Sequence, residues 1–341
     1  MPVNNLSKAA VLTCLLVVVV IGSWELYLRS KGVPISYDND KELWADKRAR
    51  VYEPADKTTV FIGSSRIKFD LDIDTWQKTT GRHAVQLAIE GSSPMPILTD
   101  LGNDPNFRGK LVVDVTEGLF YSNDKYNLQK PERNIAWYKE QTPAQKASFV
   151  LDHALESGFV FLDKDFLSLN TRLDQQYPVA DRPGVYVFPD FPLEFNRTSF
   201  ERQSKMTDRF LTDTSLQHQV QNVWLFVMEK GKKAPPPKEN PVPPIVAKAK
   251  EAIDKIRSRG GEVVFIRTPS SGPMLGVEQH VFPRERCWQP LLAGTGCTGL
   301  FYADDPATAH FICPEWSHLS PPDAVLYTKA LIGRLPSSFT N

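Results

Sequence analysis

Two short stretches of the sequence hold residue types from which a serine nucleophile and its base can be built. In the first, a short apolar run, Thr59–Ile62, stops at Gly63 and is followed by Ser64 and Ser65. A β-branched run of this kind is typical of a buried strand that ends at the carboxyl edge of a sheet, where open α/β sheets bind ligands. Because glycine allows a sharp turn, a serine just after Gly63 can point its hydroxyl group outward. Gly-Ser-Ser is also ordinary loop sequence, so this stretch alone does not identify an enzyme.

The second stretch lies near the other end of the chain, where Glu315 and His318 are three residues apart. A serine nucleophile needs a base to take its proton, and the base needs a carboxylate that orients it and stabilises its charge. One turn of chain can hold this carboxylate beside this imidazole. The alternative interpretation is a plain helix start, with Ser320 as the N-cap and Pro321 as the first helical residue.

Together the two stretches resemble the end blocks of the SGNH (GDSL-like) hydrolase superfamily. In that family the nucleophile sits in a Gly-Asp-Ser motif after the first strand, and an Asp-x-x-His pair precedes the last helix. Here Ser64 replaces the Asp of the first block and Glu315 replaces the Asp of the second. The resemblance therefore implies Ser65 as the catalytic nucleophile, His318 as its base and Glu315 as the orienting carboxylate. It is strongest to membrane-anchored members that work on cell-envelope glycans.

The resemblance also implies an oxyanion hole made by the backbone N–H groups of Gly91 and Ser65. Gly91 belongs to Leu87–Pro94, which looks like the family's second block. The third block, Gly-x-Asn-Asp, has no good counterpart, because Leu101–Asp104 has similar letters but precedes the third expected strand. Asn123 follows that strand and matches poorly, so the third oxyanion donor stays unassigned.

Composition limits the classes of partner. The 341 residues include 40 basic and 40 acidic side chains, so the chain has no net charge. No whole-molecule field attracts polyanions, and we expect no nucleic-acid partner. No C-x-x-C or His-x-x-x-His spacing occurs, which disfavours a metal site, and we expect no cofactor.

The N-terminus contains an apolar segment. Residues 9–24 carry no charge, and Leu15–Ile21 is the centre of the run. With Leu26 and Leu28 included, the segment approaches the roughly 20 residues that span a bilayer. No small-x-small cleavage site follows, so we expect residues 1–30 to be an uncleaved signal anchor. The expected location is a bacterial inner membrane, crossed once, with the catalytic domain in the periplasm.

Three cysteines, Cys287, Cys297 and Cys313, surround the second chemical stretch. In an extracytoplasmic compartment cysteines at such spacings form disulfides. We expect one disulfide among them. A Cys287–Cys297 pair and a Cys297–Cys313 pair both fit the sequence.

Short apolar runs alternate with amphipathic stretches, which predicts an α/β fold with a parallel sheet. The resemblance makes this a three-layer, flavodoxin-like core over residues 58–335, after a stalk at 31–57 and with a large helical and loop insertion at about 121–244. The helix after Ser65 is expected to be short or displaced. Expected strands are 58–62, 84–89, 111–115, 263–266 and 300–303, and expected helices begin at Pro94 or span 144–157, 200–229, 245–259 and 322–335.

Two residues follow the fourth expected strand, and a loop of the insertion is rich in aromatic residues. Arg267 and Ser270 are possible substrate-binding residues at the carboxyl edge, although Arg267 can equally pair with a surface carboxylate. The aromatic residues between Tyr177 and Phe195 either stack on sugar rings or, as is more usual, attach the loop to the body of the protein.

These observations lead to two hypotheses of different class. The first is a serine acyl esterase or O-acyltransferase that acts on an acylated glycan of the cell envelope, or on a small ester. Anchored relatives often work with a multispanning O-acyltransferase, which is a possible partner. The second is a catalytically inactive SGNH-fold protein that binds or assembles glycans. The change to Glu315 and the missing third block favour the second hypothesis, whereas Ser65 and His318 favour the first.

Overall fold

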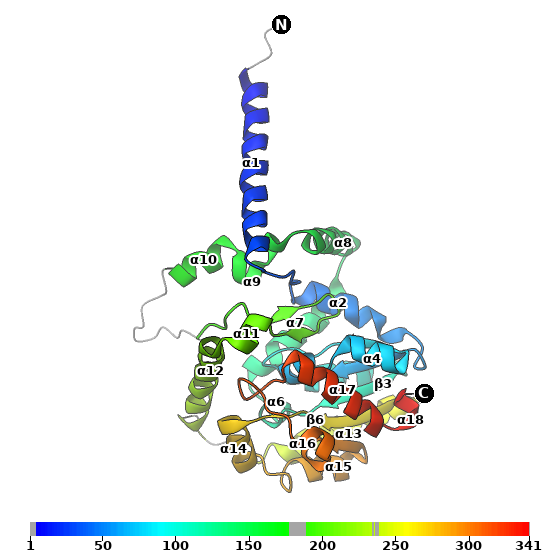
Figure 1. Ribbon diagram of the computed structural model, residues 1–341. Helices are drawn as coiled ribbons and strands as arrows, with labels where there is room; N and C mark the ends of the chain where they lie inside the picture. The colour runs from blue at the N-terminus through cyan, green and yellow to red at the C-terminus, as the bar shows by residue number, and fades with distance from the viewer. Residues whose placement is uncertain (1–4, 177–188, 234, 236–238, 341) are drawn as a thin grey trace. The chain divides into compact units, whose positions relative to one another are not determined.

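The computed structural model shows a chain that divides into two compact units, and the ribbon is drawn in Figure 1. Both stretches that carry the expected chemistry belong to unit 2. Unit 1 comprises residues 1–38 and 143–188, and unit 2 comprises residues 39–142 and 189–341. The residues that the structure describes are 5–176, 189–233, 235 and 239–340.

Unit 2 is built around a sheet of five parallel strands. Their order across the sheet is β2-β1-β3-β6-β7. Each strand is a short run rich in apolar or β-branched residues, and such runs form parallel strands when helices cover both faces of the sheet. The strands are β1 (Thr58–Ile62), β2 (His83–Gln86), β3 (Lys110–Asp114), β6 (Glu262–Arg267) and β7 (Thr298–Phe301).

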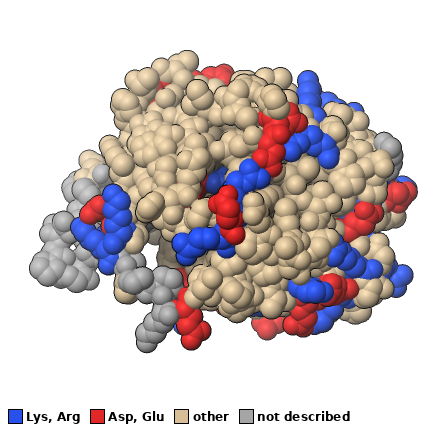
Figure 2. All heavy atoms as spheres, turned by 90° about the horizontal axis from the view of Figure 1, so that it is seen from below, with Lys and Arg blue, Asp and Glu red and all other residues tan. Residues whose placement is uncertain are grey.

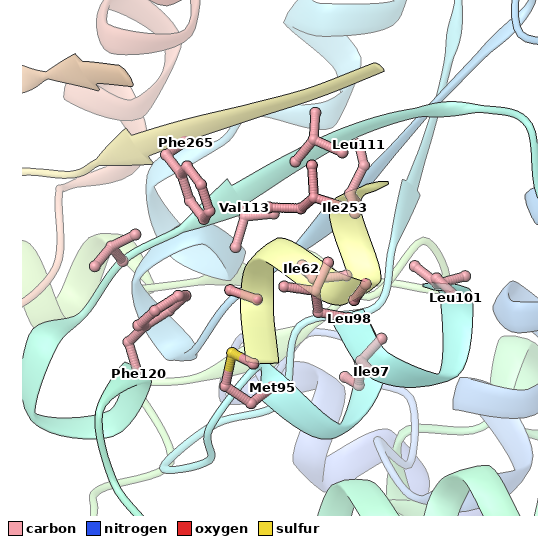
Figure 3. Close-up of a cluster of buried hydrophobic side chains, with 14 of the residues drawn as sticks. Ile62, Met95, Ile97, Leu98, Leu101, Leu111, Val113, Phe120, Ile253 and Phe265 are labelled. Carbon is pink, nitrogen blue, oxygen red and sulfur yellow. The ribbon is translucent and has the colours of Figure 1, made fainter. Parts of the chain in front are cut away.

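Helices cover both faces of this sheet. Successive strand residues point to opposite faces, so Ile62 and Phe265 join one buried cluster (Figure 3) while Phe61 and Ile266 join the other. The first cluster packs on α5 (Met95–Asn103), α13 (Val242–Ser258) and α15 (Trp288–Thr295), and the second on α3 (Ser65–Asp70), α4 (Ile73–Thr80) and α17 (Pro321–Arg334).

The predicted α/β class with a parallel sheet is confirmed. The largest difference in a strand concerns the second one, which ends at Gln86 rather than at residue 89. The chain still follows β1 beyond that point, because the N–H groups of Leu87 and Ile89 donate to the carbonyls of Phe61 and Gly63. The helix after β1 is short, as expected, with six residues.

The segment expected as a stalk, residues 31–57, differs from that expectation. From Asn39 onward it belongs to unit 2, and it contains α2 (Lys41–Ala49) and η1 (Arg50–Tyr52). Trp44 is fully buried, and its indole N–H donates to the carbonyl of Leu87 at 2.9 Å. Because α2 contains many charged residues, the sequence did not indicate that one side of this helix is buried.

The expected insertion contributes to both units. Residues 143–188 belong to unit 1, whereas the rest packs with the sheet in unit 2. The remaining elements of unit 2 are α6 (Glu117–Phe120), α7 (Lys125–Glu140), β4 (Arg197–Thr198), β5 (Ser204–Lys205), α11 (Asp208–Thr212), α12 (Thr214–Lys233), α14 (Gly272–Val281), η3 (Tyr302–Asp304), α16 (Pro306–Ala309) and α18 (Ser337–Thr340).

Unit 1 contains the apolar N-terminal segment as one helix, α1 (Asn5–Ser30). By length and composition α1 can cross a membrane, and the apolar side chains of its uncharged run, residues 9–24, are exposed. The 26 residues of α1 are about 39 Å long at 1.5 Å per residue, compared with about 30 Å for the hydrocarbon core of a bilayer. The other elements of unit 1 are α8 (Pro143–Gly158), η2 (Val160–Leu162), α9 (Lys164–Leu167) and α10 (Leu169–Gln176).

The surface charges are mixed on the face that Figure 2 shows. Lys and Arg side chains lie among Asp and Glu side chains, with uncharged surface between them. This distribution agrees with the zero net charge of the sequence.

The predicted disulfide is wrong, because all four cysteines, which the structure describes, are free thiols. Cys287 caps the start of α15 and Cys297 follows its end. The eight residues of this helix rise about 12 Å, whereas bridged Cα atoms are about 4.4–6.8 Å apart. Cys313 is buried in the cluster on the opposite face of the sheet from Cys287 and Cys297. The helix that formed between the first two cysteines is what separates them.

Candidate active site

Ser65 lies at the carboxyl end of β1, as the first residue of α3. The turn between strand and helix needs Gly63, because a Cβ atom there would come within 2.7 Å of the Asp114 Cβ and 2.9 Å of the Ile67 Cγ2. Ser64 is the N-cap residue and is buried, whereas Ser65 is partly exposed. The short, tight connection therefore presents the Ser65 hydroxyl group and buries the Ser64 hydroxyl group.

The three residues Ser65, His318 and Glu315 form a chain of hydrogen bonds. The distance from His318 Nε2 to Ser65 Oγ is 2.8 Å, and that from His318 Nδ1 to Glu315 Oε1 is 2.9 Å. With Glu315 ionised, Nδ1–H donates to the carboxylate and Nε2 is left to accept the Ser65 proton. The residues from the two ends of the chain thus have the geometry that base-assisted serine attack requires.

The turn that holds Glu315 beside His318 is itself unusual. Trp316 has a φ of +79°, a left-handed conformation that costs about 1–3 kcal/mol for a residue with a side chain. The Trp316 carbonyl accepts from the Ser271 N–H at 2.8 Å, and Glu315 Oε1 accepts from the His318 N–H at 2.6 Å. The predicted helix start is present too, because Ser320 accepts from the N–H of Asp323 at the beginning of α17. The helix start is therefore present, but Glu315 and His318 before it are buried beside each other rather than solvated.

A tryptophan from the insertion completes the carboxylate site. The indole N–H of Trp224, on α12, donates to Glu315 Oε2, and Glu315 is fully buried. Three aromatic rings surround the His318 ring, with centroids 4.4 Å (Phe69), 5.6 Å (Phe195) and 5.9 Å (Trp224) away. Trp224 was not predicted from the sequence, because nothing local marks it as a partner of a residue 91 positions later.

The described part of the aromatic loop packs inside the protein. The rings of Phe191 and Phe195 stack with their centroids 5.2 Å apart. Phe195 belongs to a buried cluster that includes Phe69 and Phe210, and Phe191 packs against this cluster. This confirms for these two residues that the loop is attached to the body. Tyr177, Tyr186 and Phe188 lie outside the described residues.

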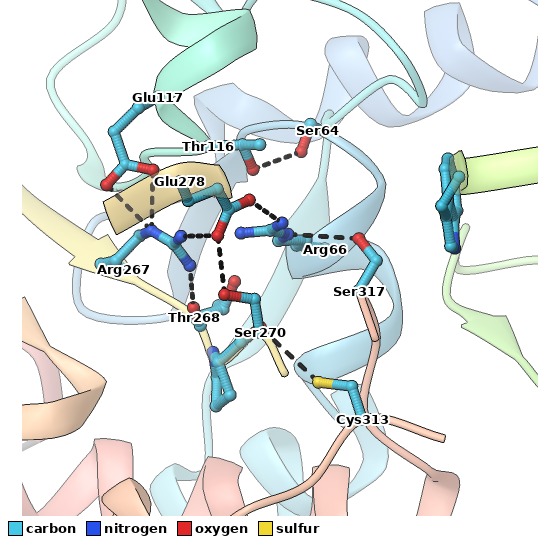
Figure 4. Close-up of polar contacts among 12 residues, drawn as sticks. Ser64, Arg66, Thr116, Glu117, Arg267, Thr268, Ser270, Glu278, Cys313 and Ser317 are labelled. Atoms are coloured by element: carbon cyan, nitrogen blue, oxygen red, sulfur yellow. Dashed lines mark hydrogen bonds and ion pairs between the residues drawn. The ribbon is translucent and has the colours of Figure 1, made fainter. Parts of the chain in front are cut away.

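A buried network of alternating charges links the loops around Ser65 (Figure 4). Arg66 and Arg267 both pair with Glu278, and Arg267 Nε also donates to both oxygens of Glu117, at 3.0 and 2.9 Å. Burial alone would raise the pKa of Glu278, but Arg66 and Arg267 lower it to about 2. Ser270 donates to Glu278 Oε2 at 2.7 Å.

The network decides how two expected substrate-binding residues are placed. Arg267 and Ser270 each have 2% of their surface exposed, and their polar groups bond to Glu117, Glu278 and the Thr268 carbonyl. In this arrangement both residues connect neighbouring segments. Arg267 pairs with carboxylates, as the alternative predicted, but Glu117 and Glu278 are largely buried rather than at the surface. Removing one partner of such a buried pair costs about 3–5 kcal/mol, because the other charge is left without a partner.

A second buried ion pair connects α3 to the expected oxyanion loop. Lys68, three residues after Ser65, pairs with Glu90, the residue before Gly91. Burial would raise the pKa of Glu90, but Lys68 and other cations lower it to about 2. Arg202 donates to the carbonyls of Gln86 and Ala88 in the same segment, at 2.7 and 3.0 Å. The loop that carries Gly91 is therefore tied to the helix that carries Ser65.

Two predicted site residues remain, Gly91 and Asn123. Gly91 is exposed and has a φ of +60°, which glycine adopts without strain. Asn123 lines a cavity of about 610 Å³ together with Tyr121 and Phe282. After β3 the residue that reaches the Gly-Ser-Ser turn is Thr116, whose hydroxyl oxygen is 2.7 Å from the Ser64 hydroxyl oxygen. The oxyanion roles of Gly91 and the Ser65 N–H stay predictions.

Asp114 lies under the turn that presents Ser65 and is fully buried. It accepts hydrogen bonds from Thr268 at 3.2 Å and Thr116 at 3.3 Å. Burial raises its pKa to about 6, although Arg267 and Arg66 nearby oppose the increase. Between pH 4 and 6 the folded protein therefore keeps a proton that the unfolded chain has lost, so this group destabilises the fold as pH rises through that window.

We expect Asp114→Asn to remove this pH dependence. The free energy of unfolding of the variant, relative to the unmodified protein, should increase by about 1–3 kcal/mol between pH 4 and pH 7.5, since one unit of pKa is worth about 1.4 kcal/mol. Denaturant titration of the two full-length proteins in the same detergent measures the difference. Glu262→Gln, a substitution of a carboxylate that is less buried, is the matched control. A difference that stays constant over this range would contradict the prediction.

No protein-family model matches the chain, and no curated protein matches it in sequence.

Proposed function

We propose that the protein is an SGNH-type serine acyl esterase or O-acyltransferase. The observation that carries the proposal is the continuous set of contacts from the Ser65 hydroxyl group through His318 to the buried Glu315. A serine, an imidazole and a carboxylate in this order define acyl-transfer sites on several unrelated folds. The position of Ser65 at the carboxyl edge of a parallel sheet supports the same proposal.

The proposed reaction follows from what each side chain can do. His318 Nε2 takes the proton of Ser65 as Oγ attacks the acyl carbonyl, and Glu315 stabilises the imidazolium that forms. The N–H groups of Ser65 and Gly91 stabilise the oxyanion, each worth about 3 kcal/mol in comparable enzymes. The leaving alcohol takes the proton back from His318, and an acyl-serine remains. Water then gives hydrolysis, and a sugar hydroxyl group gives transfer.

The sheet supports the family assignment within this proposal. Counted along the chain, the strand order β2-β1-β3-β6-β7 is 2-1-3-4-5, which is the flavodoxin-like order of doubly wound sheets. SGNH hydrolases have a flavodoxin-like core, so the strand order agrees with the resemblance of the two end blocks.

We further propose that α1 anchors the protein in a bacterial inner membrane, with unit 2 in the periplasm. The length, the uncharged run and the exposed apolar side chains of α1 support an anchor. The substrate class proposed from this location is an acylated glycan of the cell envelope or an exported polysaccharide. A multispanning O-acyltransferase is the proposed partner, because it would deliver acyl groups across the membrane to Ser65.

A fluorophosphonate probe tests whether Ser65 is activated. We expect covalent labelling of the full-length protein in detergent, with the label mapped by peptide mass spectrometry to Ser65 rather than to the adjacent Ser64. Ser65→Ala should abolish the labelling, whereas Ser258→Ala, which removes an exposed serine of α13, should not change it. Release of acetate from an aryl ester with and without an oligosaccharide acceptor then separates hydrolysis from transfer. A protein that folds but resists the probe would favour the non-catalytic glycan-binding hypothesis.

A further inference from the structure

Helix α8 of unit 1 carries an apolar stripe along one side. Ala147, Val150, Leu151, Ala154 and Leu155 recur at spacings of three and four residues, which places them on one face of a helix. All five are exposed, and the fractions reach 63% for Val150, 66% for Leu151 and 50% for Leu155. Apolar surface that is this contiguous marks a surface that contacts something else.

The opposite side of α8 is the one that packs within unit 1. His153 contacts the ring of Tyr37 at 5.4 Å and that of Phe149 at 6.3 Å. The Tyr37 hydroxyl oxygen is 3.1 Å from the Ser157 Oγ. The helix is therefore held in place through its other face, and the exposure of the stripe follows from this orientation.

The end of α8 is fixed to α1 just beyond the apolar run. Glu25, the first charged residue after residues 9–24, accepts hydrogen bonds from the N–H groups of Val160 and Phe161, at 3.1 and 3.0 Å. Arg29 donates to the carbonyl of Gly158, the last residue of α8, at 2.8 Å. Figure 1 shows α8 lying crosswise to α1 beside this end.

Residues at the same level of α1 are those that proteins place among lipid headgroups. Trp24 and Tyr27 stack at 5.5 Å and are both exposed, and the Lys31 ammonium lies 5.6 Å from the centre of the Tyr27 ring. Exposed Trp and Tyr are enriched at the boundary between the hydrocarbon core and water. If α1 spans a membrane, α8 ends at this boundary.

We propose that α8 is an interfacial helix that lies in the surface of the membrane spanned by α1, with its apolar stripe against the acyl chains. The proposal rests on the anchoring role of α1 in the proposed function. A membrane is favoured over a second copy or a protein partner because α8, which carries the stripe, ends beside α1 at the level of Trp24 and Tyr27. Such helices bury the apolar face about 5–10 Å deep, between headgroups and acyl chains.

The proposed partner of the stripe is a lipid surface, and the contact does not require a particular headgroup charge. The charged side chains of α8 are Lys146, Asp152 and Glu156, so the helix has no excess of basic residues that would select anionic lipids. Burial of the apolar side chains of the stripe drives the contact between α8 and the membrane. Unit 1 would then hold the membrane at two points, α1 and α8, so that it could not rotate freely about the axis of α1.

Lipid-dependent quenching tests the proposal. The full-length protein, with its native cysteines replaced by alanine, carries one cysteine coupled to an environment-sensitive fluorophore, in liposomes of phosphatidylethanolamine and phosphatidylglycerol. The sites are Leu151 in the stripe, Asp152 beside it, Val18 in α1, and Glu251 on α13 in unit 2, all exposed. With nitroxide-labelled lipid we expect Leu151 to be quenched at least twofold more than Asp152, Val18 to be quenched strongly, and Glu251 to be unaffected.

The outcomes separate the anchor from the interfacial helix. Quenching of Val18 with no more quenching at Leu151 than at Glu251 would overturn the proposal and leave the anchor intact. A fluorophore at Leu151 that is shielded from aqueous iodide but not quenched by lipid would mean that a protein surface covers the stripe, which also overturns it. No quenching at Val18 would reject both the anchor and the interfacial helix.

A second measurement uses the native chain, in case the cysteine replacements disturb folding. A phospholipid that carries a photoactivatable group near the headgroup should label peptides from residues 144–158, in addition to α1. Labelling of α1 without labelling of these peptides would contradict the proposal.

Discussion

Ser65→Ala and His318→Ala are each expected to lower kcat for ester cleavage by about 10⁴- to 10⁶-fold, and the double variant is expected to be no worse than either single one. The reason is that the two groups act as a unit, since neither the attack nor the proton transfer occurs without the other. The 2.8 Å contact between Ser65 Oγ and His318 Nε2 is the observation behind this expectation. Acetate release from an aryl ester by the full-length proteins in detergent measures the rates.

The controls distinguish a lost base from a damaged fold. His318 is buried among Phe69, Phe195 and Trp224, so each variant is compared with the unmodified protein by near-ultraviolet circular dichroism. His310→Ala removes an exposed histidine and should leave the rate unchanged. Near-normal turnover in His318→Ala would show that Ser65 has another base or no catalytic role.

Local patterns were sufficient to predict the sheet and to single out the two stretches that contain Ser65 and the Glu315–His318 pair. Short apolar runs that stop at a glycine or a polar residue give strand ends, and the runs at Thr58–Ile62 and Glu262–Arg267 became β1 and β6 with almost the expected bounds. In a parallel sheet these ends meet at one edge. The residue that follows the first strand could therefore be predicted to lie near the last helix.

Contacts between distant segments could not be predicted in the same way. Arg267 is the last residue of β6, so its position at the edge was predictable, but its partners Glu117 and Glu278 come from α6 and α14. A charged side chain at a sheet edge has the same local pattern whether it faces a substrate or a buried carboxylate. Burial, which decides between them, depends on segments that the local sequence does not specify.

The cysteines show the opposite error, in which closeness along the chain was taken as closeness in space. Nine residues lie between Cys287 and Cys297, and a loop of that length could bring the thiols together. The segment instead forms α15, with Leu291 and Trp288 buried against the sheet. Helix formation fixed the distance between its two ends.

Glu315 is the residue for which the structure changes the expectation most. A glutamate in place of the usual aspartate has one more rotatable bond and would hold an imidazole less firmly. Here the carboxylate accepts from the His318 backbone and ring, from the Ser317 N–H at 3.3 Å and from Trp224. These contacts restrict the longer side chain, and Trp224 supplies the donor that reaches the second oxygen.

The last prediction is therefore a coupling between Glu315 and Trp224. We expect Glu315→Gln to lower kcat by about 10²- to 10⁴-fold, less than His318→Ala, because a neutral amide does not stabilise the imidazolium that forms during the reaction. Trp224→Phe keeps an aromatic ring beside Phe191 but loses the N–H, and should cost about 10- to 100-fold, since a hydrogen bond to a charged group is worth about 1.5–3 kcal/mol.

The double variant tests whether the two residues act on the same oxygen. If the amide oxygen that Glu315→Gln introduces keeps the His318 bonds, the amide NH₂ group faces the indole N–H of Trp224, and two donors oppose each other. Trp224→Phe removes that conflict, so in the Glu315→Gln background it should cost nothing or restore part of the rate. The matched control is Phe226→Leu, a substitution on the same helix, which should act independently of Glu315. Rate losses that simply multiply in the Trp224→Phe/Glu315→Gln double variant would show that Trp224 contributes only packing, because independent effects add as free energies.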